Sequence, residues 1–301
     1  MFIIHQHSTF RLNGFRNRSE YAQDHAALVR SNILIIFVVN VTRLEVSRSH
    51  RILWLLEELK VPYELKTWKR GPDKLADPRL KDVHPLGKSP IVTIEKHDGG
   101  EPLVLVESAA IIEYLCDYYG KWLIPARYAT GREGKIGAET ESWTRYRMYM
   151  HYAEGSLMPL NLVALLMSSK PSDQDFELKI THIGVAIKNS SVPFFIKPIT
   201  NSVADKIASM FLKPNFETHY KFIESQLETS PDGGRYLCGK DLTAADILMS
   251  FPLEAGKSRS GMTEEQCPRL WKYVDFLHER EAYQRSVKKI QDLEGTFKTS
   301  L

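Results

Sequence analysis

Two short segments place hydroxyl and charged side chains directly before a helix-forming run. Residues 47–50 (SRSH) precede the amphipathic run 51–59, and residues 107–108 (ES) precede the run 109–119. The first amides of a helix lack partners within it, and the helix dipole adds positive potential there, so both places favour a bound anion. A serine hydroxyl there either hydrogen-bonds such an anion or simply caps the helix. The spacing thus indicates two candidate anion sites, with capping as the alternative at each.

A third segment carries a cation beside a proline. Lys88-Ser89-Pro90 leads into the apolar run 91–94, where Pro90 stands at the first strand position and needs no ladder hydrogen bond from its nitrogen. Lys88 can bind a carboxylate, and its alternative role is that of a solvated loop lysine. Further cationic candidates near this loop are Lys69, Arg70 and His84.

The elements that must position these residues follow the order β-α-β and then β-β-α. A parallel pair with a right-handed crossover is expected first, and the turn around Gly99-Gly100 predicts an antiparallel hairpin second. The predicted strands cover residues 33–44, 61–68, 91–94 and 102–106, and the predicted helices cover 51–59 and 109–119, the latter ended by Gly120. This order is typical of a thioredoxin-like domain.

Beyond about residue 132 helical periodicity dominates and no hairpin pattern returns. Thr243-Ala244-Ala245-Asp246 has the spacing of a capping box, with Leu242 and Ile247 at the positions of a hydrophobic staple. Helices are predicted at 216–227, 243–253, 269–278 and 281–293. The fold class is therefore α+β: an N-terminal extension (1–36), a thioredoxin-like domain (37–122) and an all-helical domain (132–301), in which residues 168–175 form a polar linker and 190–200 carry no assignment.

Bulk composition describes an ordinary globular protein. Of 301 residues, 43% are hydrophobic and 26% charged, and the net charge of +3 gives no reason to expect nucleic acid or an anionic membrane as partner. Three cysteines cannot form a full disulfide framework, so a reducing, cytoplasmic location is expected. No apolar stretch of about 18 residues predicts a membrane-spanning helix. The polar start resembles neither a signal peptide nor a presequence, so residues 1–36 are expected to be disordered.

The motifs of several other enzyme classes are missing. No G-x-S-x-G accompanies a strand, and the glycines near residue 134 have the wrong spacing for a dinucleotide-binding turn. The histidines and cysteines form no cluster with metal-ligand spacing, so no metal is expected.

Four motifs together resemble the fungal Gtt-type glutathione transferases, which are related to the serine-type and bacterial nu-like classes. They are residues 47–59, the loop 84–90, the pair 107–108 and the segment 242–250. Each motif alone is moderate evidence, but their order and gaps match those of the family. The resemblance spans about residues 38–295 and leaves the first 35 residues without an assignment.

The resemblance implies glutathione as co-substrate and Ser47 as the residue that activates its sulfur. A cysteine thiol has a pKa near 8.5, so only a few per cent is thiolate at pH 7. A hydroxyl hydrogen bond to the sulfur, helped by the helix N-terminus, would make thiolate the majority form without a general base. Ser49 is the runner-up for this role, and as the residue nearer the helix it is the expected cap.

The resemblance also assigns the two ends of the tripeptide. Glu107 would pair with the γ-glutamyl ammonium, and Ser108 would hold the γ-glutamyl carboxylate. Lys88 would reach the glycine carboxylate. The backbone of Ser89, before a cis bond to Pro90, would pair with the ligand's cysteine. Arg70 and His84 are weaker candidates for the same ligand.

The aromatic residues at helical spacing after residue 140 are the candidates for the electrophile pocket. Tyr146, Tyr149 and Met150 could line it, although an aromatic stripe at helical spacing more often belongs to a core. Relatives with cysteine in place of Ser47 reduce disulfides, and this chain has no cysteine within 60 residues of that position. This favours conjugation or peroxide reduction by the bound thiol. Conjugation is the expected activity, with glutathione-dependent peroxidase or disulfide reductase activity, or a non-catalytic binding module, as alternatives. The family is usually dimeric, so a homodimer is expected.

Overall fold

The structure is a computed structural model that describes residues 39–72, 75–96, 99–168 and 205–298. All the described residues belong to one compact unit. The predicted extension (1–36), the linker from residue 169 on and the segment 190–200 lie outside the described residues. The described helices include none that is both long and apolar enough to cross a membrane.

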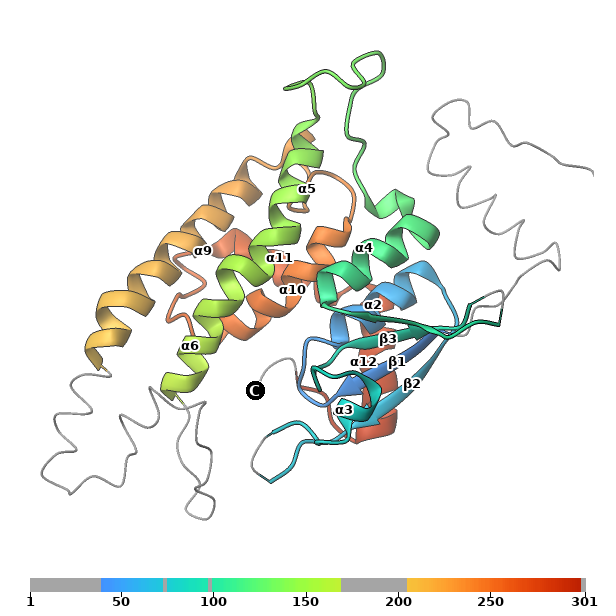
Figure 1. Cartoon of the computed structure of the whole chain (residues 1–301). Coiled ribbons are helices and arrows are strands. Elements are labelled where there is room, and N and C mark those ends of the chain that lie inside the picture. Colours follow the sequence, from blue (N-terminus) through green and yellow to red (C-terminus); the bar gives the residue numbers. More distant parts are fainter. Residues whose placement is uncertain (1–38, 73–74, 97–98, 169–204, 299–301) are drawn as a thin grey trace, which may run out of the picture. The chain divides into compact units, whose positions relative to one another are not determined.

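The first part of this unit is a four-stranded mixed sheet in the order β2-β1-β3-β4. Strand β1 (Val39–Leu44) runs parallel to β2 (Tyr63–Trp68) and antiparallel to β3 (Ile91–Ile94), which pairs in turn with β4 (Leu103–Val106). Figure 1 shows the helices that accompany these strands: α2 (His50–Leu59), α3 (Leu80–Val83) and α4 (Ser108–Tyr119). The predicted β-α-β then β-β-α order is confirmed, and the fold is thioredoxin-like.

Helix α2 is buried on more than its apolar face. Ile52, Leu55, Leu56 and Leu59 are buried as the periodicity requires, but Trp54 is also fully buried. The reason is tertiary, because α2 packs against α4 on one side and against helices of the second part on the other. These contacts position the N-terminus of α2 at the end of β1.

The second part is helical. Helix α5 (Glu141–Tyr152) continues through a π-helical turn, Ala153–Leu157, into α6 (Met158–Ser168), and Figure 1 shows this as one unbroken helical rod. A second π-helical turn, Ala208–Leu212, opens α9. The remaining helices are α9 (Lys213–Glu228), α10 (Ala244–Lys257), α11 (Pro268–His278) and α12 (Glu281–Glu294). The four predicted helices correspond to α9–α12 within a few residues, whereas α6 was not predicted.

The start of α10 is fixed by the predicted capping box. The Asp246 carboxylate accepts hydrogen bonds from the Thr243 amide at 2.8 Å and from the Thr243 hydroxyl at 2.6 Å. It also accepts from the Leu237 amide and the Tyr273 hydroxyl, so both oxygens of this fully buried group are satisfied. The staple residues Leu242 and Ile247 are buried. The box therefore anchors α10, which forms one wall of the site described below.

Helix α12 returns to the thioredoxin-like part and packs against α2. Arg43 of β1 forms a buried ion pair with Glu294, with 2.9 Å between Nε and Oε1. His50 Nε2 lies 2.9 Å from the Ser286 hydroxyl, and burial lowers the pKa of His50 to about 3. His50 is therefore neutral at pH 7, which suits its place between α2 and α12.

Candidate functional site

A cavity of about 470 Å³ lies between the loops of the thioredoxin-like part and helices α6 and α10. Six of the residues predicted to bind glutathione line it, although they come from three separate segments: Ser47, Lys88, Ser89, Pro90, Glu107 and Ser108. They meet because the C-terminal ends of β1 and β4 and the loop that enters β3 all lie at the same end of the sheet. The candidate site is therefore a product of the sheet topology.

Ser47 and Ser49 form a pair of hydroxyls below this cavity. Their Oγ atoms are 2.5 Å apart, and the Ser47 hydroxyl donates to the Leu44 carbonyl at 2.6 Å. Ser49 is fully buried and its Oγ lies 3.5 Å from the same carbonyl oxygen. Ser49 is the N-cap residue of α2, as expected, but its side chain accepts no hydrogen bond from the helix, so the predicted side-chain cap is wrong. Its hydroxyl instead supports Ser47.

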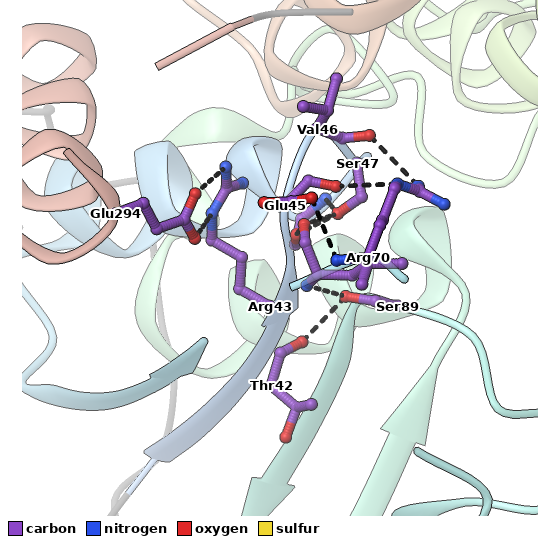
Figure 2. A network of polar contacts seen from close by, with 10 residues as sticks. Thr42, Arg43, Glu45, Val46, Ser47, Arg70, Ser89 and Glu294 are labelled. Atoms are coloured by element: carbon purple, nitrogen blue, oxygen red, sulfur yellow. Dashed lines mark hydrogen bonds and ion pairs between the residues drawn. The ribbon is translucent and has the colours of Figure 1, made fainter. Parts of the chain in front are cut away.

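The backbone next to Ser47 is strained. Val46 has a φ of +44°, which is unfavourable for a β-branched residue. Arg70 holds this turn, because its Nη2 donates to the Val46 carbonyl at 3.3 Å and its Nε to the Glu45 carbonyl at 3.2 Å (Figure 2). The Arg70 amide also donates to the Glu45 carboxylate. Arg70 lines the cavity, and the bonds seen here serve the shape of the Ser47 loop.

Ser89 ties its loop to the end of β1. Its hydroxyl donates to the Thr42 carbonyl and accepts from the Leu44 amide, each at 3.0 Å (Figure 2). The Ser89-Pro90 peptide bond is cis, as the family resemblance implied. Since both side-chain bonds go to β1, the Ser89 backbone is the part of this residue left to meet a ligand at the cavity wall.

Three cationic candidates remain, and one of them, Lys69, does not line the cavity. Lys88 is exposed at the cavity, and its ammonium makes no hydrogen bond or ion pair to the described residues. His84 does not line the cavity, and its Nδ1 accepts a hydrogen bond from the Leu86 amide within the loop. The geometry thus favours Lys88 for a ligand carboxylate and gives His84 a local role in the turn.

Glu107 and Ser108 stand where β4 passes into α4. Glu107 has a φ of +67°, so it and Val46 are two cavity-lining residues held at positive φ, where a non-glycine residue is strained. Ser108 is the first residue of α4 and is only 4% exposed. Its hydroxyl and the free amides of the first turn of α4 form an anion-binding corner.

Arg51, a buried residue that does not line the cavity, holds the hydroxyl of Ser108 by a hydrogen bond. The guanidinium is fully buried and its Nη2 donates to Ser108 Oγ at 3.0 Å. Its Nη1 donates at 2.8 Å to the Leu248 carbonyl, whose usual helical donor is missing because residue 252, four positions on, is a proline. Since Ser108 Oγ accepts from Arg51, its own hydrogen is free to be donated into the cavity.

Glu154 is the acid that neutralises Arg51, and sequence reasoning missed it. Its Oε1 lies 2.5 Å from Arg51 Nη2, and its Oε2 lies 3.2 Å from Arg48 Nη1. Glu154 sits in the π-helical turn between α5 and α6, an irregularity often found at functional sites. No local pattern marks this turn in the sequence, so the pairing across 103 residues emerges only from the fold.

The opposite wall of the cavity comes from α6, α10 and the residues after α10. Its polar members are Asn161 and Arg259. The other members are apolar: Met158, Leu162, Leu165, Phe251 and Ala255. The predicted electrophile residues Tyr146, Tyr149 and Met150 are at most 3% exposed, belong to the hydrophobic core and do not line this cavity. The α6 part of this wall therefore lies about two to four helical turns beyond Met150, and the rest comes from α10 and the turn that follows it.

The described residues contain no group of three or more potential metal ligands. The three cysteines are unpaired and buried. Burial raises the pKa of each thiol, so none of them is prepared to act as a thiolate nucleophile.

Comparison with known families agrees with this architecture. Residues 47–117 match the family described as "Glutathione S-transferase, N-terminal domain", and residues 187–285 match "Glutathione S-transferase, C-terminal domain". The first match contains the Ser47, Ser89 and Glu107 segments, and the second contains α9, α10 and α11. Fold and cavity thus define a protein of the glutathione transferase class.

Individual relatives are similar over most of their length. The chain is 31% identical to glutathione S-transferase 3 of Schizosaccharomyces pombe, covering 82% of this chain and 85% of the relative. It is 28% identical to glutathione S-transferase 1 of Saccharomyces cerevisiae, covering 86% and 98%. A solved glutathione transferase homolog from Lodderomyces elongisporus, described with two GSH per subunit, has the same fold at a TM-score of 0.55 and 20% identity, covering 83% and 97%. The chain belongs to the glutathione S-transferase family.

Proposed function

We propose that this protein transfers glutathione to an electrophile by holding the glutathione sulfur as a thiolate beside Ser47. The observation that carries the proposal is the convergence of Ser47, Lys88, Ser89 and the Glu107-Ser108 pair on one cavity. Family membership supports the same activity, since the curated relatives are named glutathione S-transferases.

The tripeptide is bound at both ends in this proposal. Glu107 takes the γ-glutamyl ammonium, while Ser108 and the first amides of α4 take the neighbouring carboxylate. The Ser89 backbone pairs with the cysteine residue of the ligand as an added strand. Lys88, whose ammonium has no partner among the described residues, takes the glycine carboxylate.

Activation of the sulfur requires Ser47 to redirect its hydrogen. In the structure this hydrogen is donated to the Leu44 carbonyl, which Ser49 Oγ can also reach at 3.5 Å. When a thiolate is present, Ser49 takes over the carbonyl and Ser47 donates to the sulfur. The thiol proton leaves to solvent, the sulfur forms a bond to the electrophilic carbon, and the leaving group departs with its electron pair.

Conjugation is preferred over chemistry that uses a protein thiol. The three cysteines are buried and have raised pKa values, so glutathione supplies the reactive sulfur. The same unpaired thiols support the cytoplasm as the expected compartment. Peroxide or disulfide reduction by the bound thiolate uses the same site and differs only in the co-substrate. A homodimer remains our expectation from the family.

Three measurements test the proposal. Thermal stability with millimolar glutathione reports binding, ultraviolet difference absorbance reports thiolate, and turnover is assayed with a chlorodinitroarene, cumene hydroperoxide and a small mixed disulfide. We expect stabilisation, a thiolate band at pH 7 and the highest activity with the chlorodinitroarene. Stabilisation without turnover of any substrate would make the protein a binding module, and no stabilisation would refute the proposed site.

A further inference from the structure

The cavity contains more positive charge than one glutathione molecule uses. Of the residues that the structure describes, four cations line it, Arg48, Arg70, Lys88 and Arg259, against a single acid, Glu107. Three of the cations have an assigned partner. Arg48 pairs with Glu154, Arg70 bonds to the Ser47 loop, and Lys88 is assigned to the glycine carboxylate under the proposed function.

Arg259 is the cation left over. It follows α10 and belongs to the wall formed by the helical part, away from the loops assigned to glutathione. Among the residues that the structure describes, its guanidinium makes one hydrogen bond, from Nη1 to the Ala255 carbonyl at 3.0 Å, and no ion pair. The other nitrogens of a group with five N–H donors have no protein partner there.

The surroundings make this unused charge unfavourable without a ligand. Arg259 is half-buried, and burial lowers its pKa, which means that its charged form has lost part of its hydration. The other described residues of this wall are apolar except Asn161, and they include Leu162, Phe251 and Ala255. A cation at the edge of an apolar surface matches a ligand that is apolar at one end and anionic at the other.

We infer that Arg259 forms a subsite for an anionic group on the second substrate, so that the preferred electrophiles are apolar molecules bearing a carboxylate. This inference rests on the proposed function, because it places the electrophile on the helical wall of the same cavity. The reacting carbon then faces the glutathione sulfur while the carboxylate is held by the Arg259 guanidinium. Arg259 selects the substrate and takes no part in the bond changes.

A matched pair of substrates isolates the charge. In 4-chloro-3,5-dinitrobenzoate and 4-chloro-3,5-dinitrobenzamide the thiolate attacks the same carbon and chloride leaves with its electron pair, but only the first is an anion. Each kcat/KM is divided by the uncatalysed rate constant with glutathione, which removes the difference in intrinsic reactivity. We expect the wild-type protein to prefer the benzoate on this scale.

The variants are Arg259→Gln, Arg259→Lys and the control Lys257→Gln. Lys257 is the last residue of α10, two positions before Arg259, pairs with Asp275 and does not line the cavity. Loss of one charge-assisted hydrogen bond predicts that Arg259→Gln lowers the value for the benzoate about tenfold and that for the benzamide less than about twofold. Arg259→Lys should recover most of the loss, and Lys257→Gln should resemble the wild type.

The opposing results are distinct. An equal loss for both substrates would mean that Arg259 only supports the fold, and no loss, or a change confined to the glutathione KM, would also overturn the subsite. Calorimetric binding of the two glutathione conjugates gives a readout that needs no turnover. If the wild type binds the carboxylate conjugate more tightly through Arg259 yet turns over neither substrate, the transferase proposal fails and the subsite stands. If the wild type turns over the substrates but shows no preference for the carboxylate conjugate, the transferase proposal stands and the Arg259 subsite fails.

Discussion

The two walls of the cavity are built in different ways. The thioredoxin-like wall consists of short contiguous motifs, each carrying its polar groups at the end of a strand or the start of a helix, and its backbone is strained at Val46 and Glu107. The helical wall is assembled from α6 and from α10 with the residues that follow it, about 90 residues apart in sequence, and is mainly apolar. The first wall suits one fixed tripeptide, and the second suits variable co-substrates.

This contrast predicts that changes on the two walls separate kinetically. Substitutions on the thioredoxin-like wall should alter the glutathione KM or the state of its sulfur. Substitutions on the helical wall should alter the KM and selectivity for the electrophile. Core residues behind the helical wall should alter neither.

The largest effect is expected at Ser47. Ser47→Ala removes a hydrogen bond to the thiolate, worth about 1.5–3 kcal/mol, and should lower turnover roughly 10–100-fold with little change in glutathione affinity. Ultraviolet titration of the bound thiol should show its pKa rising by about one to two units. Ser49→Ala should reproduce a smaller part of both changes, because Ser49 acts through Ser47. A thiolate band unaltered in Ser47→Ala would count against this role.

Glu107→Gln should act on binding instead. It removes the charge that pairs with the γ-glutamyl ammonium, so the glutathione KM is expected to rise about tenfold while turnover at saturation changes little. A glutathione analogue without the amino group should be affected far less by this substitution. If the loss were the same for both ligands, Glu107 would not contact the ammonium.

The interface behind the site is expected to be sensitive to acid. Because the pKa of His50 is about 3 in the folded protein and near 6.5 when unfolded, only the unfolded state binds the proton between these values, and stability falls as pH decreases through this window. This one group should lower the free energy of unfolding by about 1.4 kcal/mol between pH 7.5 and pH 5.5. Denaturant titrations of His50→Gln at both pH values should show a smaller difference than those of the wild type.

The smallest kinetic effect is expected at Tyr149, a core residue, and it is best compared with a residue of the helical wall. Its hydroxyl is buried without a hydrogen-bond partner among the described residues, so Tyr149→Phe should leave the kinetics with any electrophile within about twofold. Leu162→Ala, on the cavity wall, should raise the KM for an apolar electrophile several-fold by removing about one leucine side chain of contact. Assays of both variants with the same electrophile distinguish the two positions. A larger change in KM for Tyr149→Phe than for Leu162→Ala would place the electrophile pocket at the aromatic stripe.

The sequence by itself determined the elements and the polar groups that depend on local chemistry. A serine before α2, an acid and a serine before α4 and the capping box of α10 are each read within a few residues, because helix ends have local chemical requirements, whereas the cis Ser89-Pro90 bond was implied by the family resemblance. The family resemblance then supplied their shared ligand. The sheet order that brings three of these segments together follows from the β-α-β, β-β-α pattern.

Only the tertiary structure decided which helix faces line the cavity and which charges meet behind it. Tyr149 and Leu162 both occur at helical spacings, and packing alone buries the first and exposes the second. Arg51 meets Glu154 and the carbonyl freed by Pro252 across 103 and 197 residues, and Arg259 keeps its charge at an apolar wall. Such pairings depend on how the thioredoxin-like part and the helical part pack together, and periodicity in one part carries no information about the surface of the other.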